Sequence, residues 1–181
     1  LFSGTYSSDM TEYLSDQFPF RDFFVVVKAS SERMLGRMEN GGVMFCKDNL
    51  TARKDSPDTE NLKINMDAAS TFSAALENSG IPTILAVAGR RADVCIDTLP
   101  PLYGDVCQNR LWDAIDLYGD EFSGAYLNLR IPLRERAAAG EEVYYRTDHH
   151  WTSLGAYYAY AELWEVLPES LTSGMEIRAL D

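Results

Sequence analysis

The sequence predicts an α/β fold: a three-layer α/β/α arrangement in which helices cover both faces of a mostly parallel sheet. Helical and strand-like segments alternate from residue 59 onward, which is the pattern of strands joined by crossover helices. The strand-like segments 81–88 and 124–129 are also largely apolar, as expected where both faces of a strand are covered. The 181 residues suit a single domain over 1–181 with its own apolar core.

The helices are predicted from apolar residues at helical spacing and from the residues that end them. Gly36, Gly80 and Gly140 each follow such a segment, at the position where a left-handed residue commonly ends a helix. In chain order, helices are expected over 9–18, 21–35, 59–78, 108–118, 132–139 and 152–167, and short strands over 41–52, which includes a turn at 47–49, and over 143–145.

Composition restricts the partners. A formal net charge of −12 and a pI near 4.5 argue against nucleic acid and against an anionic membrane surface. No apolar run approaches the roughly 18 residues of a membrane span. The chain starts at Leu1 without an export-signal pattern, and the residues after Pro168 carry no usable pattern. We therefore expect a processed product that is incomplete at its C-terminus.

The three cysteines leave two alternatives open. Cys95 and Cys107 bracket a proline-containing loop, which a disulfide would close in an oxidising compartment. All three thiols are equally well explained as small buried hydrophobes. No Cys-x-x-Cys pair occurs, so we expect neither a zinc site nor a cofactor.

The candidate site is the stretch 144–155, which holds both histidines of the chain. Asp148 and His150 form the natural pair, because a carboxylate beside an imidazole fixes its tautomer and stabilises its charged form. If 144–146 ends a strand and Thr152 caps the next helix, the pair lies on a connecting turn, where open α/β folds bind ligands. The alternative is a structural turn that only satisfies local hydrogen bonds.

The run Arg146-Thr147-Asp148-His149-His150-Trp151 resembles the signature of the bacterial DHHW family. Its core is also similar to the motif of the periplasmic SGNH-like acetyltransferases that modify alginate and related polysaccharides. Segments 16–22 and 42–49 resemble weaker family motifs, so the likeness spans most of residues 1–160. The resemblance implies an SGNH-hydrolase-like fold and a Ser-His-Asp triad in which Asp148 orients His150, the general base. His149 lies at the variable position between them.

The resemblance also implies a nucleophilic serine well downstream of this motif, and no Gly-Asp-Ser or Asp-Ser-Tyr run is present. We expect that serine outside these residues, since the simplest role of Ser153 is to cap a helix. In the relatives, the strand matching 81–88 ends in a loop at the active-site cleft. Arg90 and Arg91 are thus candidate substrate contacts, or alternatively a solvated turn paired with Asp93. His149 and Arg146 are further substrate-binding candidates.

Three functions follow. The first is an extracytoplasmic esterase or O-acetyltransferase acting on acetyl esters of a polysaccharide, with its export signal removed. The second is a non-catalytic surface module that binds glycan. The third uses Asp148, His149 and His150 as metal ligands; it is disfavoured because adjacent histidines do not easily converge on one ion and no fourth ligand is visible. No oligomeric state is predicted.

Overall fold

The computed structural model describes residues 5–52, 59–101, 103 and 106–179. The chain divides into two compact units, Leu1–Gly41 and Gly42–Asp181, which are described separately. The single domain expected over residues 1–181 therefore stays a prediction. None of the helices in the described ranges combines the length and the hydropathy that a membrane span requires.

The first unit consists of helices α1 (Thr5–Asp16) and α2 (Arg21–Met34) and the short strand β1 (Glu39–Asn40). Pro19 lies between the two helices, as predicted, and Phe20 before α2 adopts a left-handed conformation with φ 60°. No residue of α2 is buried. The apolar residues of α2 were expected to pack in a core or an interface. None of them is buried within this unit, and the interface stays a prediction.

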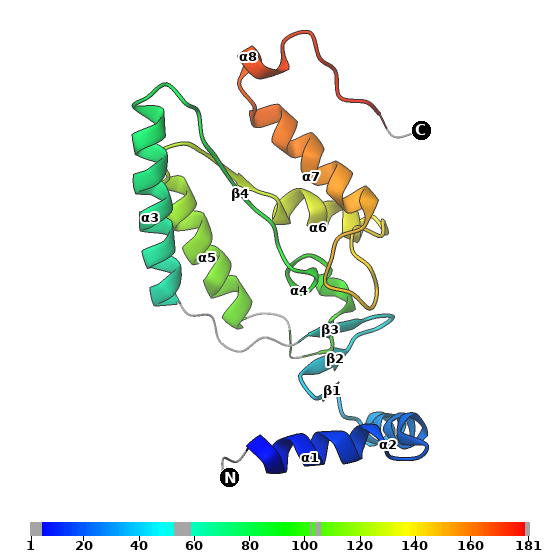
Figure 1. The fold of residues 1–181 in the computed structure, drawn as a ribbon. Coiled ribbons are helices and arrows are strands. Elements are labelled where there is room, and N and C mark those ends of the chain that lie inside the picture. Colours follow the sequence, from blue (N-terminus) through cyan, green and yellow to red (C-terminus); the bar gives the residue numbers. More distant parts are fainter. Residues whose placement is uncertain (1–4, 53–58, 102, 104–105, 180–181) are drawn as a thin grey trace. The chain divides into compact units, whose positions relative to one another are not determined.

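The second unit carries the predicted alternation of helices and strands. In chain order its elements are β2 (Val43–Phe45), β3 (Leu50–Ala52), α3 (Thr59–Glu77), β4 (Ile84–Val87), α4 (Arg91–Val94), the 3₁₀ helix η1 (Ile96–Thr98), α5 (Val106–Asp120), β5 (Ala125–Asn128), α6 (Arg130–Ala138), α7 (Ser153–Val166) and α8 (Glu169–Thr172). Figure 1 shows α3 and α5 side by side on one side of β4, and α6 and α7 on the other. Helices therefore lie on both sides of the strands, as the alternation predicts.

Strands β4 and β5 are parallel, with a register that runs from Ile84 opposite Ala125 to Val87 opposite Asn128. Both strands are only half-buried, and Ala86 is exposed. The prediction that they are buried on both faces was therefore too strong. Hairpin strands β2 and β3 are antiparallel and enclose the predicted turn at 47–49.

The residues predicted to end or begin helices do so in the structure. Gly36, Gly80 and Gly140 have φ values of 80°, 76° and 90°, so each adopts the left-handed conformation that glycine permits most readily. Thr152 has extended backbone angles and its side chain accepts a hydrogen bond from Gly155 N, which makes it the N-cap of α7. The start of α7 is therefore fixed by its own sequence.

The main core of the second unit holds the segment that leads into the candidate site. Leu133 of α6 and Val143 are fully buried, and they cluster with Val94, Tyr144 and Ala159. Residues 143 and 144 are thus packed against α4, α6 and α7. Because these apolar side chains lose their water contact only in this arrangement, burial fixes the position of the chain just before residue 145.

The cysteines differ in what the structure describes. Cys46 is buried and Cys95 is half-buried, both are free thiols, and burial raises the pKa of each thiol. Thiols with raised pKa values are poor nucleophiles at neutral pH. Because Cys95 is a free thiol, the alternative of a disulfide between Cys95 and Cys107 is not found in the structure; the side chain of Cys107 itself lies outside the described residues.

Candidate functional site

The three predicted residues Asp148 to His150 lie on a short hairpin whose two arms pair with each other. Tyr144 and Trp151 form an antiparallel bridge, and Tyr145 N donates a hydrogen bond to His150 O at 3.2 Å. We call residues 144–151 the Asp-His-His turn. The expected strand over 143–145 is reduced to this single bridge, because the segment pairs with the chain that follows it rather than with β4 or β5.

The Asp-His-His turn is anchored to the start of α7. Thr152 Oγ1 accepts from Gly155 N at 3.1 Å and donates to Glu142 O at 2.6 Å, while Thr152 N donates to Val143 O at 3.0 Å. Gly155 sits so close to the incoming chain that a Cβ there would lie 2.1 Å from Val143 O. The motif glycine is therefore required by close packing of backbone on backbone, and both ends of the turn are held.

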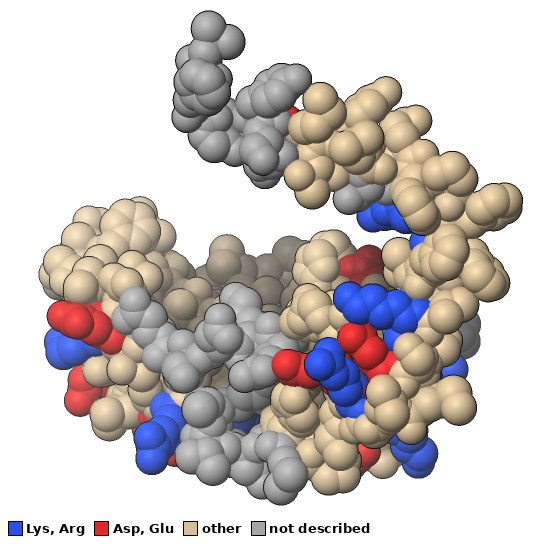
Figure 2. Space-filling view, turned by 90° about the horizontal axis from the view of Figure 1, so that it is seen from below, with Lys and Arg blue, Asp and Glu red and all other residues tan. Residues whose placement is uncertain are grey.

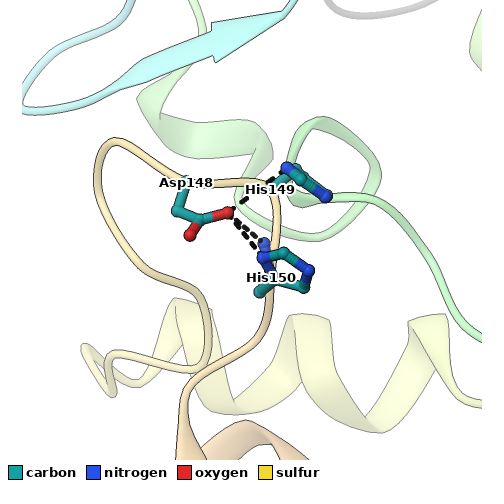
Figure 3. Close-up of side chains that lie close together, drawn as sticks. All are labelled: Asp148, His149 and His150. Carbon is teal, nitrogen blue, oxygen red and sulfur yellow. Dashed lines mark hydrogen bonds and ion pairs between the residues drawn. The ribbon is translucent and has the colours of Figure 1, made fainter.

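Within the turn, the carboxylate of Asp148 is bound twice by His150. Oδ1 accepts from the His150 amide at 3.1 Å and lies 2.7 Å from its Nδ1 (Figure 3). These two hydrogen bonds, the backbone one first, lower the pKa of Asp148. Since the carboxylate accepts, the proton of a neutral His150 resides on Nδ1, and Nε2 is left as an acceptor. This is the tautomer that a general base needs.

His149 lies against the same carboxylate. Its Nδ1 is 3.2 Å from Asp148 Oδ1, and its ring centroid is 4.0 Å from that of His150. The side chains of Asp148, His149 and His150 are 49%, 84% and 63% exposed. A reacting molecule would therefore reach both imidazoles from solvent.

The side chains of Asp148, His149 and His150 are also of the types that bind metal ions. Asp148, His149 and His150 each offer one ligand atom, and these atoms all lie within 4.8 Å of one another. The adjacent histidines therefore converge, contrary to the expectation from sequence. Within the described residues the group contains no fourth protein ligand, so an ion there would keep open positions, as in catalytic rather than structural zinc sites.

Two of the predicted substrate-binding arginines are paired with acids. Arg90 Nε lies 2.9 Å from Asp93 Oδ2, and its side chain is 37% exposed; the predicted pairing with Asp93 is confirmed. Arg146, the third residue of the Asp-His-His turn, pairs with Glu142 and is exposed. On the face that Figure 2 shows, most Lys and Arg side chains likewise have acidic side chains close by.

Arg91 is placed differently from the other predicted contacts. It is only 7% exposed, and its guanidinium donates to Asn49 Oδ1 at 3.1 Å, to Tyr144 O at 3.2 Å and to Tyr145 O. Asn49 was not singled out from the sequence as a site residue. Its position in a turn gave no signal that it would meet Arg91, which lies 42 residues away along the chain.

A cavity of about 230 Å³ lies beside the chain that enters the turn. It does not include the side chains of Asp148, His149 or His150. Acidic, basic and hydroxyl groups line it together, among them Asp48, Arg91, Asp97, Thr98, Glu142 and Arg146. The cavity also has apolar lining residues, among them Val94, Ala137 and Val143, and it borders the chain at Glu142 to Tyr144 that leads into the turn.

The nucleophilic serine implied by the resemblance was expected outside these residues, and that stays a prediction. Ser153 is exposed and is the first residue of α7, while its neighbour Thr152 makes the cap. Within the ranges that the structure describes, no serine hydroxyl hydrogen-bonds His150. The described part of the chain thus supplies an oriented base and its acid but no serine hydroxyl bound to His150.

Comparison with known proteins gives a family. The model of the SGNH hydrolase-like domain of acetyltransferase AlgX matches residues 42–179. A search of curated proteins found no match. The matched range is the second unit almost in full, and it contains the whole Asp-His-His turn.

Solved structures share the fold. The O-acetyltransferase domain of Pseudomonas putida AlgJ is 23% identical over 75% of this chain and 49% of that chain, with a TM-score of 0.60. Bacillus cereus PatB1 with a sulfonyl adduct is 16% identical over 76% of this chain and 47% of its own, also with a TM-score of 0.60. This chain spans about half the length of these structures. The α/β fold predicted from the sequence is therefore SGNH-like.

Proposed function

The chain belongs to the family of SGNH hydrolase-like domains of the acetyltransferase AlgX, and from this premise we propose that it is part of an extracytoplasmic O-acetyltransferase or acetylesterase acting on a polysaccharide. The observation that carries the proposal is the Asp148–His150 pair, whose 2.7 Å contact leaves Nε2 of His150 as the proton acceptor. The run Asp148-His149-His150-Trp151 further supports the proposal that the chain is a member of the DHHW family.

In the proposed reaction, Nε2 of His150 removes the proton from a serine hydroxyl as its oxygen attacks the acetyl carbonyl. The ester bond of the donor then breaks, and His150 returns the proton to the departing alkoxide. A sugar hydroxyl or water attacks the acetyl-serine in the same way and restores the serine. Asp148 holds the imidazole and stabilises its charged form. General-base help of this kind contributes about 10²–10⁴ in rate.

We assign the nucleophile to a serine outside the 181 residues, in keeping with its downstream place in the relatives. His149, Arg90 and Arg146 are the proposed substrate contacts. Their support is exposure, since all three present polar atoms to solvent near the turn or at the end of β4. A neutral polysaccharide suits a protein of net charge −12 better than a polyanion does.

The second candidate is a glycan-binding module with a structural Asp-His-His turn. It is favoured by one observation, the lack of a described serine hydroxyl on His150. The exposed imidazoles would then contact sugar hydroxyls without transferring protons.

A serine-directed fluorophosphonate separates the two functions. The complete native protein is labelled and mapped by intact-mass and peptide mass spectrometry. The acetyl-transfer proposal expects one labelled serine, loss of labelling in His150→Ala, and retained labelling in His149→Ala, which keeps the Asp148–His150 pair. No adduct in the folded complete protein would contradict the enzyme and leave the binding module.

A further inference from the structure

We propose that Arg91 is a positioning residue for the Asp-His-His turn: its guanidinium holds the backbone of Tyr144 and Tyr145 so that His150 meets Asp148. This inference rests on the proposed function. It gives Arg91 a role different from the substrate contact expected from the sequence, because its side chain is buried and its hydrogen bonds go to protein oxygens.

The Arg91 guanidinium is buried and depends on its hydrogen-bond acceptors. A buried charge is costly unless its donors are satisfied, and Arg91 is 7% exposed. Its partners are three neutral oxygens: the side-chain carbonyl of Asn49 and the backbone carbonyls of Tyr144 and Tyr145. Hydrogen bonds from a charged donor are stronger than neutral ones. Moving the backbone at 144–145 would therefore take two of these three acceptors away from a buried charge.

A short chain of hydrogen bonds leads from Arg91 to the catalytic pair. Tyr145, whose carbonyl accepts from Arg91, donates its own N–H to His150 O at 3.2 Å. The His150 amide in turn donates to Asp148 Oδ1 at 3.1 Å. One residue thus lies between the guanidinium and His150. A shift at Tyr145 is transmitted directly to the His150 backbone, which carries one of the two hydrogen bonds to Asp148.

Neighbouring contacts hold the same segment from two more directions. Leu50 N of β3 donates to Arg146 O at 2.9 Å, and the Tyr144 hydroxyl donates to Gly89 O. Arg91 connects these two supports, since it starts α4 two residues after Gly89 and reaches Asn49, the residue before Leu50. The hairpin β2–β3 and the end of β4 are thereby joined at the entry to the turn.

The geometry requires arginine rather than any cation. The Nε group donates to Asn49 while NH1 donates to both tyrosine carbonyls, so the donors occupy different edges of one plane. A lysine ammonium is a single point with three donors and cannot span these acceptors. Arg91→Lys keeps the positive charge but removes the separate Nε and NH1 donors, so it tests the donor geometry without changing the charge.

Arg134 offers a matched control. Its guanidinium also donates two N–H groups to one buried backbone carbonyl, Asp93 O, at 3.3 and 2.6 Å. Asp93 is outside the turn. Arg134→Lys therefore alters a pair of guanidinium hydrogen bonds in the same region whose acceptor, Asp93 O, is not part of the path to His150.

The test uses the complete protein with two readouts, the pKa of the Asp148 carboxyl from its ¹³C shift and the fluorophosphonate labelling rate. In Arg91→Lys we expect the Asp148 pKa to rise toward its ordinary value and the labelling rate to fall by about tenfold or more, the size of a misplaced general base. Arg134→Lys is expected to leave both readouts unchanged. Equal behaviour of the two folded variants would overturn the proposal.

The experiment also distinguishes a variant that does not fold from a wild-type protein that is not labelled. If Arg91→Lys does not fold, Asn49→Ala replaces it, because it removes the acceptor of Arg91 Nε and leaves the guanidinium in place; an unchanged Asp148 pKa and labelling rate there would overturn positioning. If the wild-type protein is not labelled, the enzymatic function fails. The Asp148 pKa then still tests whether Arg91 holds the turn.

Discussion

Oδ1 of Asp148 accepts two hydrogen bonds from His150, one from its backbone amide at 3.1 Å and one from its Nδ1 at 2.7 Å. The residues are two apart in sequence, so both hydrogen bonds form within the Asp-His-His turn, whose entry at Tyr144 and Tyr145 accepts hydrogen bonds from Arg91. The backbone hydrogen bond holds the carboxylate independently of the imidazole, because it does not involve the side chain of residue 150.

His150→Ala is expected to raise the pKa of Asp148 only part of the way to its ordinary value. The largest cause of the lowered pKa is the backbone N–H of residue 150, and the imidazole comes second; alanine keeps the first and loses the second. A ¹³C titration of the Asp148 carboxyl checks this. Complete recovery of the ordinary pKa would show that the amide hydrogen bond is not made in solution.

Asp148→Asn is expected to lower the rate of serine labelling by about 10²–10⁴ while the protein stays folded. The asparagine amide no longer stabilises a positively charged His150 and does not enforce the tautomer with Nε2 free. Labelling kinetics and circular dichroism measure the two effects. His149→Ala is the control, because the 2.7 Å contact between Asp148 and His150 does not involve it; an equal loss in both variants would contradict the assigned roles.

Gly155→Ala is expected to lower the free energy of unfolding, by about 1–3 kcal/mol for an overpacked site. Helix propensity alone predicts the opposite sign, since alanine is favoured over glycine by about 1 kcal/mol within a helix. The added Cβ would lie 2.1 Å from the backbone oxygen of Val143, which is fully buried and cannot move aside cheaply. Urea unfolding decides the sign, and a stabilised variant would contradict the close packing of α7 on the turn.

Tyr144→Phe is expected to cost about 1–3 kcal/mol at neutral pH, because it leaves the buried carbonyl of Gly89 without its hydroxyl donor. Burial raises the pKa of Tyr144 to about 12. The protonated phenol therefore adds stability that is complete below the ordinary pKa near 10 and is lost as the pH rises through about 12. The stability gap between wild type and Tyr144→Phe should shrink over that range in denaturant titrations. A gap that does not change with pH would argue against a buried phenol.

Removing divalent metals with a chelator is expected to leave serine labelling unchanged, since the proposed proton transfer runs through Nε2 of His150 and a serine hydroxyl. The ligand atoms of Asp148, His149 and His150 lie within 4.8 Å of one another, so metal content should be measured by mass spectrometry in the same samples. Loss of labelling on chelation, with recovery on adding zinc, would replace the general-base role by metal coordination.

The candidate site was partly readable from the sequence. Asp148 and His150 could be paired from their spacing, and the family model covers the turn that holds them. The expected strand over 143–145 was wrong, because a run of one valine and two tyrosines fits an isolated bridge as well as a strand. Only the pairing of Tyr144 with Trp151 distinguishes the two. The roles of Arg90 and Arg91 could not be separated either: they are adjacent, yet one pairs with Asp93 at the surface and the other is buried.

By itself, the sequence determined the features that depend on near neighbours: the alternation of helices and strands, the left-handed glycines, the Thr152 cap and the Asp148–His150 pair. Each is set by hydrogen bonds or steric limits within a few residues. Only the tertiary structure decided that Arg91 reaches Asn49 and Tyr144, which lie 42 and 53 residues away. Such contacts form when apolar burial brings α4, the β2–β3 hairpin and the entry to the turn together, and no local pattern encodes which polar groups are then enclosed.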